Sequence, residues 1–246
     1  MPGYGTCGPY SDFVAFGPSV EPMTGLTTTM GYNAGELRTT AMALPDAAAG
    51  VTAAAAVVTA LAQREQTGEG CYLDLSLHEA AINLFGERFI ETQLTGDSPE
   101  VKGNQNPEFA PQGIYRCAGE DEWIAISCPT DETWQSMCEY MDMDWNTRGE
   151  FLTDRDRQLN HEKLNILLTE FTKERGKLEL MKQLQKAGVP AGAVMTAPEF
   201  MSDPHIVDQE YFTELGDDHV EHLPFPGSPV RFDSRRASDW VRAPRL

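Results

Sequence analysis

A run of small and apolar residues from Ala47 to Gln63 most constrains how this chain can fold. Alanine favours the α-helix, and Gly68 and Gly70 follow the run where a helix would end. Because almost every position is apolar or small, such a helix has no polar face to turn toward water and requires cover on several sides. The sequence therefore predicts a buried helix within a layered fold.

The residues around this run predict an α/β unit. Residues Cys71 to Ser76 alternate in the manner of a strand, and Leu77 to Leu94 returns to helical spacing. The first forty residues contain many turn signals and predict loops and short helices. The order helix, strand, helix is typical of the end of an α/β domain.

A polar segment rich in glycine, proline and asparagine, from Thr95 to Gln112, predicts a domain boundary. After it, residues 113–117 and 123–128 alternate as two strands joined by an acidic turn, which predicts a β-hairpin. Three helices and a turn into a short strand are expected beyond the hairpin, at 132–140, 164–171, 177–186 and 188–194. The last forty residues show no strong periodicity.

Composition argues against several classes of function. The chain has 38 acidic and 19 basic residues, and a net charge of −19 argues against a nucleic-acid partner, because phosphate binding requires a basic surface. The alanine-rich run is shorter than the ~20 apolar residues of a membrane span, and no segment has the form of a signal peptide. We therefore expect a cytoplasmic protein with no membrane partner. Its acidity is also compatible with a salt-adapted source.

Cysteine and histidine patterns predict neither a metal site nor a redox site. The five cysteines are irregularly spaced without a CxxC pair, so we expect reduced thiols. The five histidines show no spacing typical of metal ligands.

Asp46 lies at the expected start of the alanine-rich helix, directly after Pro45. A carboxylate there is close to backbone N–H groups without partners in the helix and to the positive end of the helix dipole, which keep it ionised. Taken alone, the residue is most simply interpreted as an N-cap, because aspartate is among the commonest caps. The surrounding residues decide whether it has a further role.

Ordered motifs surround Asp46 and extend over essentially the whole chain. Those before and after it are Gly8-Pro9-Tyr10, Thr24-Gly25-Leu26, Gly31-Tyr32, Arg64, Thr67-Gly68, Asp74 to Ser76 and Glu79-Ala80. Those further on are Gly103-Asn104, Ala110-Pro111, Gly188 to Gly192 and Asp203-Pro204-His205. Together they resemble the class III CoA-transferases, the family that contains formyl-CoA transferase, carnitine CoA-transferase and α-methylacyl-CoA racemase.

The resemblance implies a fold and a reaction. In this family the aspartate that Asp46 matches is the nucleophile, and CoA passes from an acyl-CoA to a carboxylic acid through a covalent aspartyl-CoA thioester. It implies acyl-CoA as a substrate and no permanently bound cofactor. The implied fold is α/β, with a Rossmann-like large domain, a small α+β domain and an interlocked homodimer. Residues 1–95 would be the C-terminal part of the large, CoA-binding domain, 96–200 the small domain, and 201–246 a segment returning toward the large domain.

Four further positions are expected to contact the CoA substrate. Phe16 matches the histidine base of the racemases, and Gly17 stands where formyl-type transferases have a glutamate; Glu21 lies nearby but does not match that motif. Gly103 and Asn104 match a glycine-rich loop that closes over the aspartyl intermediate, although a polar interdomain turn is an equally good interpretation of this pair.

Two alternatives to a working transferase stay open. Family members begin with a Rossmann-like half, and this chain resembles the portion that follows it. It is therefore either a transferase portion or a fragment or split-gene product that needs an N-terminal half. A racemase is less favoured, because phenylalanine at position 16 cannot transfer a proton.

Overall fold

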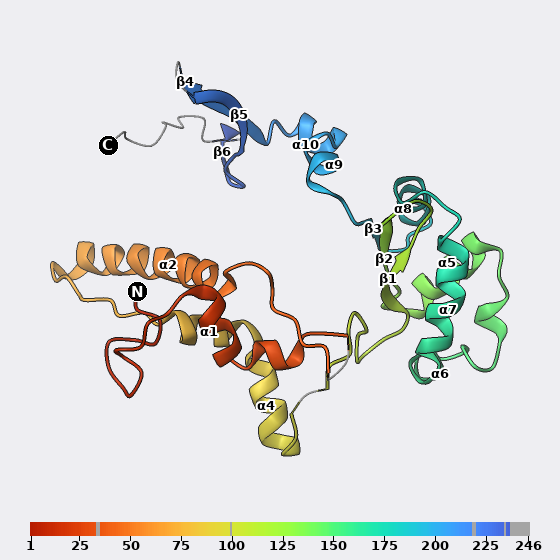
Figure 1. The fold of residues 1–246 in the computed structure, drawn as a ribbon, viewed down its shortest axis with the longest axis horizontal. Coiled ribbons are helices and arrows are strands. Elements are labelled where there is room, and N and C mark those ends of the chain that lie inside the picture. Colours follow the sequence, from red (N-terminus) through yellow and green to blue (C-terminus); the bar gives the residue numbers. More distant parts are fainter. Residues whose placement is uncertain (33–34, 99, 218–219, 234, 237–246) are drawn as a thin grey trace.

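The computed structural model describes residues 1–32, 35–98, 100–217, 220–233 and 235–236. Helices and short antiparallel sheets form a mixed α/β structure with an N-terminal group of helices, a body built around a small sheet, and a C-terminal segment (Figure 1). Each of the first two parts has a hydrophobic cluster of its own. The domain limits at 95 and 200 stay a prediction.

Four α-helices with two short 3-10 turns make up the described N-terminal part. They are α1 (Gly17–Met23), α2 (Leu44–Thr67), α3 (Leu77–Ile82) and α4 (Gly86–Thr95), with turns at Leu26–Thr29 and Asn83–Phe85. Val20, Ala49, Leu77 and Ala80 form a small core where α1, α2 and α3 meet. The expected short helices among the first forty residues are thus confirmed.

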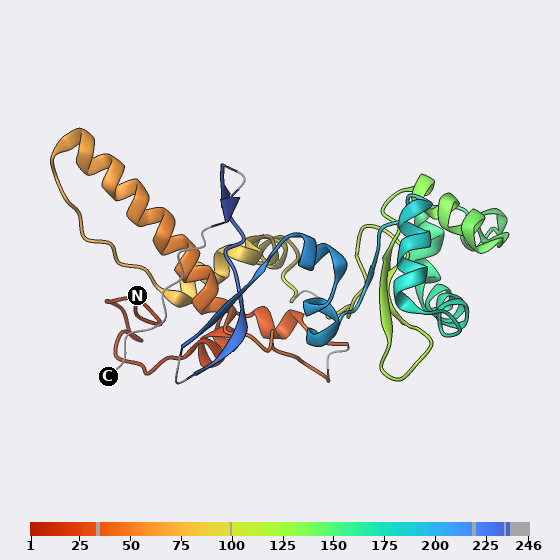
Figure 2. The same ribbon diagram turned by 90° about the horizontal axis from the view of Figure 1, so that it is seen from above.

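The alanine-rich helix is present, but it is not buried. α2 begins at Leu44 and ends where Gly68 takes a φ of +76°, a conformation that glycine adopts without strain. Val51 and Val58 are 75% and 67% exposed, and α2 extends away from the other helices (Figure 2). The expected burial is therefore wrong within the described residues, which cover α2 only on the side of Pro45 and Ala49.

By length and composition, α2 is also long and apolar enough to cross a membrane, a test that core helices of soluble proteins pass as well. The helix is therefore longer than the alanine-rich run indicated, and the expectation that it is too short to span a membrane is wrong. The absence of a membrane partner stays a prediction.

Residues 71–76 do not form the expected strand. The segment runs beside the first residues of the chain: Thr6 N–H and its hydroxyl donate to Asp74 Oδ2, and His78 N–H donates to Gly3 O at 2.9 Å. Alternating side chains give a strand only where a second strand supplies a hydrogen-bonded ladder, and the described residues supply none here. The helix expected over 77–94 is interrupted at Asn83–Phe85.

The expected hairpin and the strand after it are confirmed. β1 (Gln112–Arg116), β2 (Trp123–Ser127) and β3 (Ala191–Ala193) form an antiparallel sheet in the order β1-β2-β3, with Ile114 opposite Ala125. Ile124 and Ile126 of β2 point into the larger hydrophobic cluster, while Ala125 between them faces the other side. One face of the sheet is therefore packed on helices.

The helices of this body are α5 (Asp131–Met141), α6 (Asp154–Leu159), α7 (His161–Thr172) and α8 (Lys177–Lys186). Three of them confirm the predicted helices, and α6 was not predicted.

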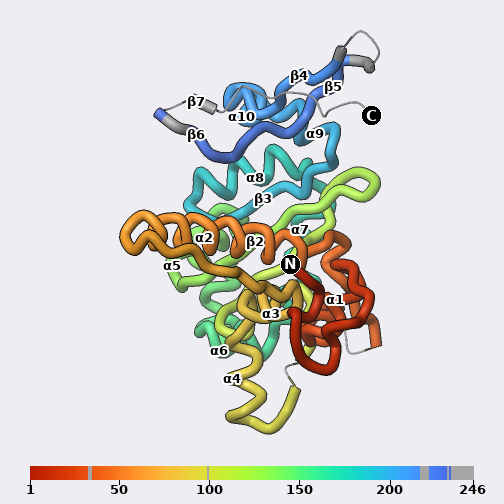
Figure 3. Tube along the Cα trace, turned by 90° about the vertical axis from the view of Figure 1, so that its left-hand side faces the viewer, coloured from red at the N-terminus to blue at the C-terminus, as the bar shows by residue number. Residues whose placement is uncertain are grey.

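The C-terminal segment then forms α9 (Ala197–Met201), α10 (Pro204–Asp208), β4 (Phe212–Asp217), β5 (Val220–Pro226), β6 (Arg231–Phe232) and β7 (Arg235–Arg236). It leaves the sheet at β3 and lies at the opposite end of the view from α4 (Figure 3). Its return toward the large domain stays a prediction, and residues 237–246 lie outside the described residues.

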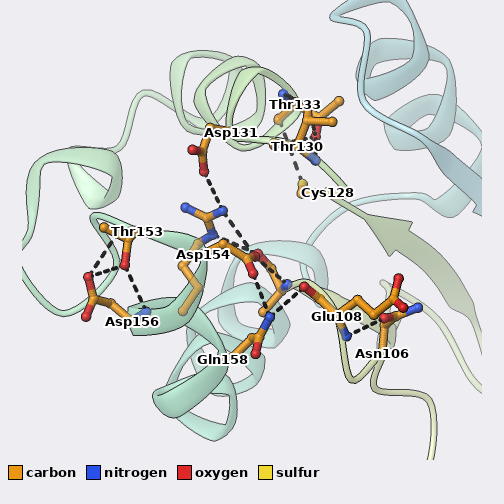
Figure 4. A network of polar contacts seen from close by, with 12 residues as sticks. Asn106, Glu108, Cys128, Thr130, Asp131, Thr133, Thr153, Asp154, Asp156 and Gln158 are labelled. Atoms are coloured by element: carbon orange, nitrogen blue, oxygen red, sulfur yellow. Dashed lines mark hydrogen bonds and ion pairs between the residues drawn. The ribbon is translucent and has the colours of Figure 1, made fainter.

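A buried arginine ties the connecting segment to this body. Arg157 is 1% exposed; its Nε donates to Ala110 O and its Nη2 to Asp131 Oδ1, both at 2.7 Å. Asp154 accepts from Ala110 N–H at 3.1 Å, and Gln158 donates to Glu108 O at 2.6 Å (Figure 4). The residues just before β1 are thereby fixed to α6.

We expect Arg157→Ala to lower the free energy of unfolding by roughly 2–4 kcal/mol, because it removes buried packing and leaves the Ala110 carbonyl unpaired. The exposed partner Asp131 contributes little to this loss. Arg148→Ala is the matched control: Arg148 pairs with Asp144 at 2.7 Å on the surface, and its loss should cost less than about 1 kcal/mol. Equal effects in urea denaturation would contradict the anchoring role of Arg157.

Lys177 joins three segments of the chain. It is 5% exposed and contacts Glu122 at 2.7 Å, Glu199 at 2.8 Å and the carbonyl of Val194 at 2.9 Å. The hydrogen bond from Lys177, followed by those from Thr196, lowers the pKa of Glu199 to about 2. The start of α8 therefore holds the hairpin turn and the exit of β3 together.

Because the folded-state pKa of Glu199 is below its usual value of 4.5, its stabilising contribution is present above that pH and is lost as the pH falls toward about 2. The free energy of unfolding of Glu199→Gln should therefore depend less steeply on pH than that of the wild type across this window. Denaturant titrations from pH 5 to about pH 2 would measure the two slopes. Identical slopes would show that the ion pair is not formed in solution.

Candidate active site

Asp46 is the third residue of α2, after the N-cap residue Ala43. The interpretation of Asp46 as an N-cap is therefore wrong. Its side chain is exposed and, among the described residues, makes no hydrogen bond or ion pair. Fewer free amides surround it than expected, because Leu44 N–H donates to Met42 O at 2.8 Å and Pro45 has no N–H. The main local source of positive potential is the dipole of the long helix itself.

Gly17 lies directly against the Asp46 carboxylate. A Cβ atom added at position 17 would be 2.0 Å from Asp46 Oδ2 and 2.7 Å from Ala43 Cβ, so only glycine fits in this arrangement. The N-terminus of α1 thus packs on the first turn of α2. Two of the residues expected at one site, Asp46 and Gly17, are in contact.

Phe16 is next to this contact, and its side chain is free to meet a ligand. Its backbone is fixed, because Phe16 N–H donates to Ser19 Oγ at 3.0 Å and the Ser19 hydroxyl donates to Phe16 O at 2.9 Å. The ring itself is 72% exposed. An exposed aromatic ring beside an exposed carboxylate is a suitable surface for a molecule with an apolar acyl group.

The structure does not place Gly103 and Asn104 beside Asp46. Gly103 has a φ of +59° and lies near Gly31 and the ring of Tyr32, and Asn104 O accepts from the side chain of Gln112 at 3.2 Å. Both residues line a cavity of about 670 Å³ on the uncovered face of the sheet, with Gly113, Ser127 and Gly192 among its walls. A larger cavity of about 810 Å³ is lined by charged side chains of α4 and the connecting segment. Asp46 lines neither, so the two halves of the expected site are separate in the described chain.

Glu21 does not match the sequence motif, but the structure connects it to this site. Glu21 of α1 is 1% exposed, and its carboxylate accepts from Thr40 N–H at 2.9 Å and contacts the Thr40 hydroxyl. Thr40 lies shortly before α2. The signal that would have found Glu21 is its spacing of four residues from Gly17, which puts both on one face of α1.

Other groups with catalytic potential are poorly suited to chemistry. Burial raises the pKa of the Cys128 and Cys138 thiols to about 12, so they are inert at neutral pH. Burial also lowers the pKa of His161, whose Nε2 accepts from Gln112 N–H at 3.3 Å. Within the residues that the structure describes, no group of three or more His, Cys, Asp or Glu side chains is placed to hold a metal ion.

Comparison with known proteins places this chain in a family. The model of CoA-transferase family III matches residues 1–246, and the chain belongs to that family. The motifs around Asp46 thus identified the family correctly.

Relatives and a solved structure agree with this assignment. The chain is 30% identical over 241 residues to a succinyl-CoA–D-citramalate CoA-transferase of Chloroflexus aurantiacus, covering 97% of this chain and 60% of the relative. It is 28% identical over 194 residues to a succinyl-CoA:mesaconate CoA-transferase of Haloarcula marismortui, covering 78% and 48%. A CAIB/BAIF family protein from Brucella suis superposes with a TM-score of 0.85 at 26% identity, over 100% of this chain and 63% of that chain. The chain thus spans about three fifths of the length of these relatives or less.

The one-sided packing of α2 predicts effects of very different size on the free energy of unfolding for two substitutions in this helix. Val58→Glu adds a charge on the open face and should change the free energy of unfolding by less than about 0.5 kcal/mol. Ala49→Glu buries a charge between α1 and α3 and should cost several kcal/mol. Denaturation of the two variants measures the difference. A large loss in Val58→Glu would mean that this face is already covered in solution.

Proposed function

We propose that this chain carries the nucleophile of a CoA-transferase that moves CoA from an acyl-CoA to a carboxylic acid, and that the nucleophile is Asp46. The observation that carries the proposal is the exposed Asp46 carboxylate in the first turn of α2, packed on Gly17, in a member of CoA-transferase family III. The chain contributes a carboxylate, a helix dipole and the aromatic surface of Phe16.

In the proposed reaction the Asp46 carboxylate attacks the donor thioester carbonyl, the C–S bond breaks, and a mixed anhydride and CoA thiolate form. The thiolate attacks the Asp46 carbonyl of the anhydride, which gives an aspartyl-CoA thioester and frees the donor acid as its carboxylate. An acceptor carboxylate repeats the two steps in reverse, so that acceptor-CoA leaves and the Asp46 carboxylate is restored. No proton or electron is gained or lost, so no base or redox group is required.

The properties of the site match this reaction. A nucleophilic carboxylate must be ionised, accessible and held in position. Asp46 is exposed and lies in the first turn of the 24-residue helix, where the helix dipole is positive. No racemase is proposed, because the exposed Phe16 ring offers no second base beside Asp46.

Substrates and assembly belong to the proposal as well. The relatives named above act on succinyl-CoA with citramalate or mesaconate, so we propose succinyl-CoA as the first donor to test. We also propose a cytoplasmic, interlocked homodimer in which a Rossmann-like half covers the exposed apolar face of α2. Val51 and Val58 support this proposal, because an apolar helix face of this length is stable when another surface packs on it.

Mass spectrometry of the intact chain after incubation with succinyl-CoA, with hydroxylamine to trap acyl groups, tests the proposal. We expect an adduct on Asp46 and complete loss of it in Asp46→Asn, which keeps the size of the side chain but removes the nucleophile. Glu65→Gln removes the same charge from the last turns of α2 and serves as the control. Full adduct formation in Asp46→Asn would refute the proposed role. An adduct that forms only after the Rossmann-like half is added as a separate polypeptide would identify the chain as part of a split enzyme.

A further inference from the structure

One face of α1 makes two contacts one helical turn apart, the first with the start of α2 and the second with the segment that leads into it. At the first, Gly17 lies against Asp46 Oδ2 and the side chain of Ala43. At the second, Glu21 binds the backbone N–H and the hydroxyl of Thr40. Val20, which is fully buried, packs with Ala49 of α2 between these contacts. Gly17 therefore packs on the first turn of α2, and Glu21 holds the segment that precedes it.

The second contact leads to the helix along the backbone. The Thr40 hydroxyl lies between the Glu21 carboxylate and Met42 O, 2.7 Å from the latter, and its single proton goes to one of these acceptors at a time. Leu44 N–H donates to Met42 O at 2.8 Å. Leu44 is the first residue of α2 and is two residues from Asp46. A shift of the Glu21 side chain would thus be passed to the helix end that carries the carboxylate.

We propose that Gly17 and Glu21 are positioning residues for Asp46. Gly17 provides the space that the carboxylate occupies, and Glu21 fixes the segment that leads into α2. The inference rests on the proposed function for its kinetic consequence, but the contacts themselves exist independently of the reaction. It also gives a physical reason for glycine at position 17 in this chain: with α1 and α2 placed as they are, a Cβ atom there would be 2.0 Å from Asp46 Oδ2 and 2.7 Å from Ala43 Cβ, and one of these groups would have to move.

The first test uses Gly17→Ala in the full chain. The added methyl group must push Asp46 or Ala43 aside, and a misplacement of about 1 Å costs on the order of 100-fold in rate. We therefore expect the rate of aspartyl adduct formation at saturating succinyl-CoA to fall roughly 100-fold, with little change in the half-saturating concentration. Gly50→Ala is the matched control. Gly50 is on α2, the helix of Asp46, and a Cβ added there meets nothing within 4 Å. Its rate should equal that of the wild type.

The second test compares Glu21→Ala with Glu21→Gln. Alanine removes both contacts to Thr40, whereas glutamine keeps an acceptor for Thr40 N–H and offers its amide to the hydroxyl. We expect Glu21→Ala to slow adduct formation and Glu21→Gln to restore most of the lost rate. If Gly17→Ala does not fold, this pair decides the question.

Amide hydrogen exchange over residues 44–49 separates a failure of this inference from a failure of the proposed function. Exchange should be faster in Gly17→Ala and Glu21→Ala than in the wild type. In Gly50→Ala it should be no faster than in the wild type, because alanine inside a helix stabilises it. If the wild type forms no adduct even after the Rossmann-like half is added, the transferase proposal fails, and faster exchange still supports the positioning role. Adduct formation and exchange that stay at wild-type values in both Gly17→Ala and Glu21→Ala would overturn it.

Discussion

The close approach of Gly17 to the first turn of α2 is the contact on which the N-terminal part depends. It requires the absence of a side chain, since even one methyl group would overlap the Asp46 carboxylate. Val20, Ala49 and Leu77 form the small core in which α1, α2 and α3 meet. The absence of a Cβ atom at residue 17 thus allows both the packing of α1 on α2 and the observed position of Asp46, the residue with a proposed covalent role.

The second half of the chain is held together differently. The sheet and its helices share a large hydrophobic cluster, and two buried cations, Arg157 and Lys177, join its edges to the segments that enter and leave it. Buried charges of this kind stabilise a fold only when their hydrogen bonds are well formed. Here they fix the geometry of the chain where it passes from one part to the other.

Local patterns in the sequence predicted the second half well and the first half less well. The hairpin around residues 112–127 and helix α8 depend on near neighbours, so alternation and helical spacing were sufficient to predict them. The strand expected at residues 71–76 and the burial of α2 depend on partners that are distant in the sequence, and a local pattern does not show whether such partners are present. At the candidate site, motif resemblance predicted Asp46 and Gly17, which the structure places in contact, and their roles stay a prediction. Glu21 was left out because it does not match the motif, and a local pattern does not reveal its contact with Thr40, nineteen residues away.

The contacts of Lys177 have a mechanical consequence. One ammonium group clamps the hairpin turn, the end of β3 and α9, so the C-terminal segment leaves the sheet in a fixed direction. Arg157 does the same for the segment that enters β1. The small body is thereby tied at both ends, at Ala110 where the chain enters the sheet and at Val194 where it leaves.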